Sequence, residues 1–371
     1  MRHRMLLASV ATFGALLALH AAPAHAGVVN PDISLIGQPI VRWTDDPSDA
    51  RAYRHLGFDV GETEIVFDSA LNPYARGFAT LSLSNGQANV EEAYFTILRG
   101  LPAGLEVKGG KYRVGFGKLN PAHPHTYPFV ERFHVLGKFL PGDDSYDETG
   151  VNVSGRIPMP GDIALTASAD ILQGDSFQSA ADSLPRGKTK AHNAYVSRLS
   201  AFIPIGDRSG LELGATGTQG VNDIYSGAKT TVVGGDAKLK LWVSDNANVL
   251  IQAEYLHEDR EITGDTPIFG HWKPTGGYAF VNYSWAQRYN VGASFETSSS
   301  VNSSWSSDKS VGLFAGLALM EETTWFRLGF EHTTPGTGSI AFDSGTASQS
   351  SINTIRLGIV YSMGPHKAHQ F

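Results

Sequence analysis

The chain contains no cysteine among its 371 residues. It can therefore form no disulfide framework, no thiolate metal site and no cysteine nucleophile. Positive charge is also in short supply, because 29 Lys and Arg stand against 36 Asp and Glu, a formal net charge of −7. This acidic balance argues against a nucleic-acid partner.

Long apolar runs are confined to the N-terminus. Arg2 and Arg4 precede the largely apolar stretch 5–22, which ends near the small-x-small sequence Ala24-His25-Ala26. We interpret residues 1–26 as a secretory signal peptide rather than a transmembrane helix. Its removal takes two arginines with it and makes the net charge −9.

Residues 27–371 form the predicted mature domain, and no stretch in it is long and apolar enough to span a bilayer as a helix. If this domain lies in a membrane, it must do so as a β-barrel. Composition does not argue against that, because half of each strand in such a barrel faces water.

Short alternating segments of about ten residues run through the mature chain. Tight connections are expected at seven places: 70–72, 100–102, 158–161, 204–209, 244–246, 286–288 and 320–322. Longer connections are expected near 44–56, 114–148, 172–190, 220–230, 259–274, 299–308 and 333–351, with one short exception at 84–87.

The seven tight turns join fourteen strands in pairs, and a first strand near Ile33–Trp43 and a last strand, Ile352–Met363, make sixteen. Pro39 interrupts the first of these. We therefore predict an all-β fold, a transmembrane antiparallel β-barrel of sixteen strands. A soluble sandwich is the alternative, but it gives no reason for connections that alternate between short and long.

Alternation within strands separates an apolar face from a polar one. In the last strand, one face carries Ile355, Leu357, Ile359, Tyr361 and Met363. The opposite faces are expected to line the lumen, with the charged candidates Arg156, Arg198, Lys238, Lys240, Arg327, Arg356, Glu92, Glu212, Glu254, Glu296 and Glu331. Acids and bases nearly balance there, so the wall alone does not set ion selectivity.

The connection at about 114–148 is the longest irregular segment, and we predict that it forms a constriction in the barrel. The pore residues that we predict around it are all basic: Lys108, Lys111, Arg113, Lys118 and Arg132. A positive constriction favours anions. The alternative is that these cations pair with the acids at the far end of the same loop, Asp143, Asp144, Asp147 and Glu148.

Two histidines in the loop, His123 and His125, form a His-x-His pair that can ligate zinc or copper. Against this interpretation, Pro124 stiffens the pair and no carboxylate lies near it at ligand spacing. The tail histidines, His366 and His369, are weaker candidates. Beyond zinc at this pair, the sequence indicates no cofactor.

The chain lacks the HExxH, Walker and GxSxG motifs. A catalytic triad cannot be selected from its many Ser, His and acidic residues, because a triad is defined by geometry. We therefore predict no enzymatic activity and no catalytic residues.

Several stretches resemble a group of proteobacterial outer-membrane proteins described as porin-like and similar to the phosphate-selective porins. Some members carry the name "zinc-regulated TonB-dependent outer membrane receptor". The matching pieces are NPDISLIG (30–37), VEEAYFTILRGLPAGLEVKGGKYRVGFGKLN (90–120), HPHTYPFVERF (123–133), GGYAFVNYSW (276–285) and the ending GPHKAHQF. The resemblance implies a barrel in the outer membrane of a Gram-negative bacterium and hints at a homotrimer, but it carries over no functional residue.

Energised uptake does not fit the length of the chain. TonB-dependent receptors have about 22 strands and a plugged lumen, and this chain closes a smaller barrel with nothing left for a plug. We predict a porin-like channel for passive diffusion of small hydrophilic solutes, with anions as the favoured class. A metal-binding or metal-uptake protein, and a non-conducting structural or surface-interaction barrel, are the alternatives. The transported solute, the pore width and the oligomeric state stay open.

Overall fold

A computed structural model describes residues 30–84, 86–142, 145–178, 192–262, 270–299, 307–319, 323–336 and 351–365. The signal peptide, Asp143, Asp144, the predicted turn 320–322 and the tail histidines lie outside these residues. The first strands are β1 (Asp32–Gly37), β2 (Ile40–Thr44), β3 (Gly57–Asp59), β4 (Thr63–Asn72), β5 (Ala75–Ser84), β6 (Gln87–Ile97), β7 (Glu106–Arg113), β8 (Asp147–Ile157) and β9 (Ala164–Leu172). The others are β10 (Ala194–Ile205), β11 (Ser209–Asp223), β12 (Ala228–Ser244), β13 (Ala247–Ile262), β14 (Gly270–Trp272), β15 (Thr275–Trp285), β16 (Tyr289–Ser298), β17 (Asp308–Ala318), β18 (Thr324–Thr334) and β19 (Ile352–Met363).

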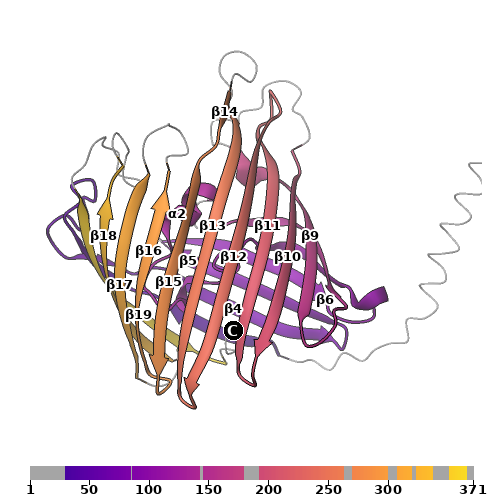
Figure 1. The fold of residues 1–371 in the computed structure, drawn as a ribbon, viewed down its shortest axis with the longest axis horizontal. Helices are drawn as coiled ribbons and strands as arrows, with labels where there is room; N and C mark the ends of the chain where they lie inside the picture. Colours follow the sequence, from indigo (N-terminus) through magenta and orange to yellow (C-terminus); the bar gives the residue numbers. More distant parts are fainter. Residues whose placement is uncertain are drawn as a thin grey trace, which may run out of the picture.

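These segments build a closed barrel in which every named strand pairs antiparallel with its neighbours (Figure 1). Closure comes from the last strand, because β19 pairs with both β1 and β2. Three wall strands are interrupted once each, namely β1 with β2, β3 with β4, and β14 with β15. The nineteen described segments therefore make sixteen wall strands, as the sequence predicts.

The first interruption lies at Gln38 and Pro39, between β1 and β2. Proline has no N–H to give to a sheet, but the carbonyl of Pro39 still accepts a hydrogen bond from Ile359 N at 3.0 Å. The break therefore costs the wall one donor without opening it.

The outward face of the wall is apolar, and the inward face is polar or covered by the chain. In β19, Ile355 and Met363 are 44% and 56% exposed, whereas Arg356 on the opposite face is 8% exposed. Near the turn after β15, Tyr283, Trp285 and Tyr289 stack at 5.5 and 5.3 Å between ring centroids. An exposed apolar band bordered by aromatic side chains is the surface that a bilayer requires.

One predicted connection is shorter than expected. We expected a longer connection at 220–230, but β11 runs to Asp223 and β12 begins at Ala228. Asn222 lies within that expected connection but joins strands, because its amide donates to Thr230 Oγ1 at 2.9 Å and to the Glu261 carbonyl at 3.1 Å.

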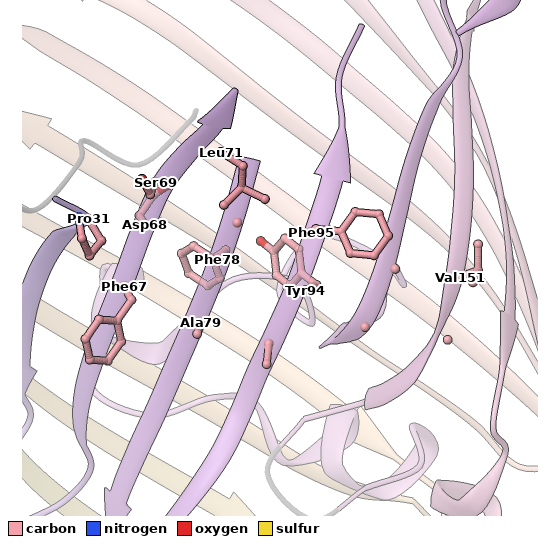
Figure 2. A pocket seen from close by; sticks show the side chains of 15 residues that line it. Pro31, Phe67, Asp68, Ser69, Leu71, Phe78, Ala79, Tyr94, Phe95 and Val151 are labelled. Atoms are coloured by element: carbon pink, nitrogen blue, oxygen red, sulfur yellow. The ribbon is translucent and has the colours of Figure 1, made fainter. Parts of the chain in front are cut away.

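The outer surface over β4 to β7 has a shallow apolar hollow (Figure 2). Its floor is made of small outward residues, Gly77, Ala79, Ala93 and Gly109, and its borders are Phe67, Leu71, Phe95 and Val151. Within the described residues, no helix has the length and apolarity needed to cross a bilayer.

Candidate functional site

The connection between β7 and β8, residues 114–146, folds into the barrel. Its described part contains a short 3-10 turn, Pro124–Thr126, and helix α2 (His134–Phe139), which contacts β13, β15 and β16 (Figure 1). This loop supplies most of the buried apolar cluster of the molecule. The barrel therefore has an apolar core inside its polar wall, and the loop provides it.

Aromatic packing fixes the loop to one side of the wall. Phe129 lies 5.2 Å from Phe280 on β15 and 5.6 Å from Phe314 on β17, both edge to face. Phe133 stacks on Tyr278 with centroids 4.3 Å apart. Buried aromatic side chains of this kind contribute about 1.5–3 kcal/mol each.

Glycine in the wall leaves room for the loop. At Gly276 on β15, an added Cβ would lie 2.6 Å from Val135 Cγ2 and 2.8 Å from Phe139 Cε2. At Gly358 on β19, it would lie 2.9 Å from Val130 Cγ1. The inward face of the wall is thus shaped to the loop as well as polar.

Polar side chains of the wall hold the backbone of the loop. Arg327 on β18 is 1% exposed, and its Nη1 donates to the carbonyls of Pro124, Tyr127 and Phe129 at 3.0, 3.0 and 2.9 Å. Glu254 on β13 accepts N–H bonds from two further loop residues, Lys118 at 2.5 Å and Leu119 at 3.0 Å. Irregular backbone inside a barrel needs such partners, because buried N–H and C=O groups must be paired.

Three of the predicted pore cations are engaged with carboxylates. Arg113 pairs with Glu91 and is buried. Lys118 reaches Glu212 on β11. Lys111 pairs with Asp147 at 2.7 Å, which is one of the acids at the far end of the loop that the sequence offered as partners.

The side chain of Lys111 points away from the lumen. It lies opposite Ala93 and Thr149, in register with the outward positions of β6 and β8. Lys108 lies on the opposite, inward face, with its Nζ 4.7 Å from the ring of Tyr94 and 5.1 Å from that of Tyr112. Among the residues that the structure describes, Lys108 makes no ion pair with a carboxylate.

Arg132, the fifth predicted pore cation, lies in the loop, where its Nη2 donates to Asn120 Oδ1 at 3.1 Å. Burial is the main reason that its pKa is lowered. The same asparagine binds backbone, since its amide donates to the carbonyls of Val114 and Tyr146 at 2.8 and 3.0 Å. Arg132 thus helps to join the two ends of the loop.

The histidine pair meets an acidic part of the wall. His123 Nδ1 lies 3.2 Å from Glu64 Oε2, and His125 Nδ1 lies 3.3 Å from Glu64 Oε1. His123 Nε2 bonds Glu92 on β6 at 2.9 Å. Burial by itself would lower the pKa of His123, but Glu64 and Glu92 outweigh it and raise that pKa to about 10.

A third loop histidine, His134 at the start of α2, lies 3.8 Å from Glu331. Burial would lower the pKa of His134, but Glu331 and Glu296 raise it to about 9. Glu131 beside it contacts Arg356 at 2.5 Å and Arg42. This second cluster ties the loop to β2, β16, β18 and β19.

The sequence could not show which wall residues contact the loop. Glu64, Glu91 and Arg327 all contact it, yet they lie between 32 and 203 residues from their loop partners. Strand alternation places Arg327 on the lumen face, but nothing in the sequence pairs it with particular loop carbonyls.

No family model matches the chain. A protein of Aquifex aeolicus (strain VF5), described only as uncharacterized, is 30% identical over 259 residues, which cover 64% of this chain and 54% of the relative. The match therefore spans about half the length of that relative.

Solved structures are similar over nearly the whole chain. The anion-selective porin from Comamonas acidovorans has a TM-score of 0.59 at 12% identity, over 90% of this chain and 100% of the porin. OmpT, an outer membrane protein of Vibrio cholerae, has a TM-score of 0.58 at 11% identity, with 91% and 99% covered. The outer membrane channel DcaP of Acinetobacter baumannii has a TM-score of 0.56 at 15% identity, with the same coverage.

This chain has the porin fold. At these identities the likeness shows the fold alone, and the closer resemblance to phosphate-selective porins stays a prediction.

Proposed function

We propose that the protein is a channel of the bacterial outer membrane through which small hydrophilic solutes diffuse passively. One observation supports this most strongly: a closed barrel carries an apolar outer face, a charged inner face, and a loop that is anchored inside it. A loop held within the lumen narrows a pore and selects by size and charge. Neither a catalytic activity nor energised uptake is part of this proposal.

Conductance of the mature protein in a planar bilayer tests the proposal. Folding is checked first by heat-dependent mobility in SDS gels. We expect stable open steps from folded, inserted protein. Silence from such protein would overturn the channel and favour the alternative of a non-conducting barrel that acts through its outer loops.

We propose that Lys108 gives this channel a preference for anions. It is the predicted pore cation that points inward and makes no ion pair with a described carboxylate. One of the structures with the same fold is described as an anion-selective porin, which agrees with this expectation.

Lys108 and Lys111 provide a matched pair for testing selectivity, since they lie on one strand and face opposite sides. Lys108→Glu should shift the reversal potential in a salt gradient towards cations, and Lys111→Glu should leave it nearly unchanged. Equal shifts from both variants, or none from Lys108→Glu, would contradict an anion site at this position.

We also propose that copies of the chain associate through the hollow over β4 to β7. Small residues at a lipid-facing surface allow close approach between neighbouring proteins, and one solved OmpT structure is described as a trimer form. Cross-linking in membranes should give a trimer, and Gly77→Leu should reduce it without reducing the folded barrel. An unchanged cross-linking pattern would place the interface elsewhere.

A further inference from the structure

Three groups that ligate metals converge beneath the outer end of the barrel wall. Glu64 comes from β4, and His123 and His125 come from the loop. Their side chains are 0%, 14% and 5% exposed. The sequence shows the histidine pair but no carboxylate near it at ligand spacing, and folding supplies that carboxylate from the wall.

The distances in this cluster match the spacing of ligands around one shared ion. Ligands bound at about 2.0–2.1 Å to a tetrahedral zinc lie roughly 3.3 Å from one another. The two nitrogen–oxygen distances here are 3.2 and 3.3 Å. Charge-assisted hydrogen bonds are shorter, about 2.7–2.9 Å.

Two of the facing atoms lack a hydrogen bond of ordinary geometry. His123 Nδ1 and Glu64 Oε2 are buried and contact each other as an ion pair at 3.2 Å, but neither makes such a bond within the described part of the chain. Buried polar atoms without partners are rare because each one costs about 1–3 kcal/mol. A cation between these two atoms would satisfy both.

The surrounding residues orient His123 as they would a metal ligand. Its Nε2 bonds Glu92 Oε2 at 2.9 Å, and Glu92 Oε1 in turn accepts the backbone N–H of Arg113 at 2.9 Å. Ligating histidines commonly donate their other ring nitrogen to a carboxylate, which leaves the first nitrogen free to bind the ion. Here Nδ1 is the nitrogen that faces Glu64, and a bound ion would take the place of the proton on it.

The cluster around His134 serves as a contrast. His134, Glu296 and Glu331 also lie close together, but His134 Nε2 is 3.8 Å from Glu331, and Arg356 lies 3.5 Å from that same carboxylate. An arginine already supplies the positive charge there. We assign that cluster to ion pairing.

We propose that Glu64, His123 and His125 bind one divalent transition-metal ion of the zinc and copper class. Water or Glu91, whose Oε1 lies 3.9 Å from His123 Nδ1, would take a fourth position. Glu64 pairs with Ser82, two positions before β5 ends at the short connection to β6. The ion would therefore lie near the outer mouth and join the loop to the wall.

Metal titration of the folded mature protein tests this site independently of conductance. After treatment with a chelator, calorimetry with Zn²⁺ should show one ion per chain with a dissociation constant well below 1 mM. Cu²⁺ bound to the unmodified protein should show coupling to two nitrogens by electron paramagnetic resonance. No binding below the millimolar range, or a copper spectrum without nitrogen coupling, would overturn the proposal.

Three variants separate this site from other histidines. His125→Gln should weaken zinc binding at least tenfold, whereas His271→Gln, which removes an imidazole 2.7 Å from Asp259 on β13, should not. The double change His366→Gln and His369→Gln removes the tail pair. Binding lost only in that double variant would assign the ion to the tail and overturn the site proposed here.

Glu64→Gln keeps the shape of the side chain and removes its charge. If the variant folds, as judged by gel mobility, we expect at least a tenfold loss of zinc affinity. Unchanged affinity would refute a role for this carboxylate. If the variant does not fold, the copper spectrum of the unmodified protein decides.

Discussion

The loop meets the barrel wall in two regions that differ in chemistry. The His123–His125 turn faces carboxylates of β4 and β6. The segment 129–139 packs aromatic and aliphatic side chains against β15 and β17. We call the first the ionic region and the second the apolar region.

The two regions respond to different conditions. Apolar packing depends on shape and on excluding water, and it changes little with pH or salt. Contacts between histidine and carboxylate depend on protonation and on any bound cation. We therefore expect the apolar region to fix the position of the loop in the barrel. We expect the strength of the attachment of the His123–His125 turn to the wall to depend on pH and on bound cations.

The largest effect should come from removing an aromatic ring from the apolar region. Phe133→Ala would leave a cavity beside Tyr278 and Phe129, and such changes cost about 3–5 kcal/mol. Unfolding by urea in lipid vesicles measures this free energy. Phe295→Ala is the control, because Phe295 faces outward and is 44% exposed. Equal losses of unfolding free energy in the two variants would show that packing inside the barrel stabilises the protein no more than an outward-facing ring does.

A smaller effect should come from filling the space at Gly276. In Gly276→Ala the new methyl group would lie 2.6 Å from Val135 Cγ2, and overpacking of this kind costs about 1–3 kcal/mol. Limited proteolysis should then cleave the loop sooner. Gly329→Ala is the matched control, since its methyl would lie at an ordinary 3.6 Å from Val130 Cγ2. Faster cleavage in Gly329→Ala than in Gly276→Ala would contradict this fit.

The barrel could be predicted from the sequence because apolar and polar residues alternate within each strand and so mark its two faces. Ile355 and Leu357 alternate with Arg356 in the sequence, and in the structure they lie on opposite sides of the wall. This information is local, with a period of two residues. The tight turns are also local signals, and counting them gave the number of strands. The ends of loops depend on contacts between strands, which the sequence does not show. At 220–230, Asn222 bonds to neighbouring strands, and the connection is shorter than predicted.

The site could be predicted only in part, because its contacts join distant segments. The sequence indicates a long loop with histidines and cations, but it does not show that Glu64 lies beside His123, or that Arg327 binds three loop carbonyls. The sequence places Lys111 among the pore residues, but Gly109 and Gly110 interrupt the alternation beside it. The direction of its side chain follows only from the register of β7 against its neighbours.

A still smaller effect is expected from pH, and it tests how much the charge of His134, within the segment 129–139, adds to the packing of that segment. His134 is faced by Glu331 on β18, Glu296 on β16 and Arg356 on β19, and its pKa is raised from 6.5 to about 9. A raised pKa in the folded state adds stability below pH 6.5, and this contribution is lost as pH rises through 9.

His134→Gln should therefore reduce the difference in thermal stability between pH 6.5 and pH 9.5. His271→Gln is a suitable control, because that imidazole lies apart from the loop, beside Asp259. If the pH dependence of His134→Gln matches that of the unmodified protein, the histidine does not hold α2 through its charge.

The smallest effect should come from Arg42, which shares the carboxylate of Glu131 with Arg356. The Arg42 side chain is 39% exposed, whereas that of Arg356 is 10% exposed. Exposed ion pairs contribute about 0–1 kcal/mol, but breaking a buried pair costs about 3–5 kcal/mol because it leaves a charge without a partner. In urea unfolding, Arg42→Gln should thus lie close to the unmodified protein and Arg356→Gln well below it. If the two variants lose the same stability, the exposure of each arginine does not set the strength of its contact with Glu131.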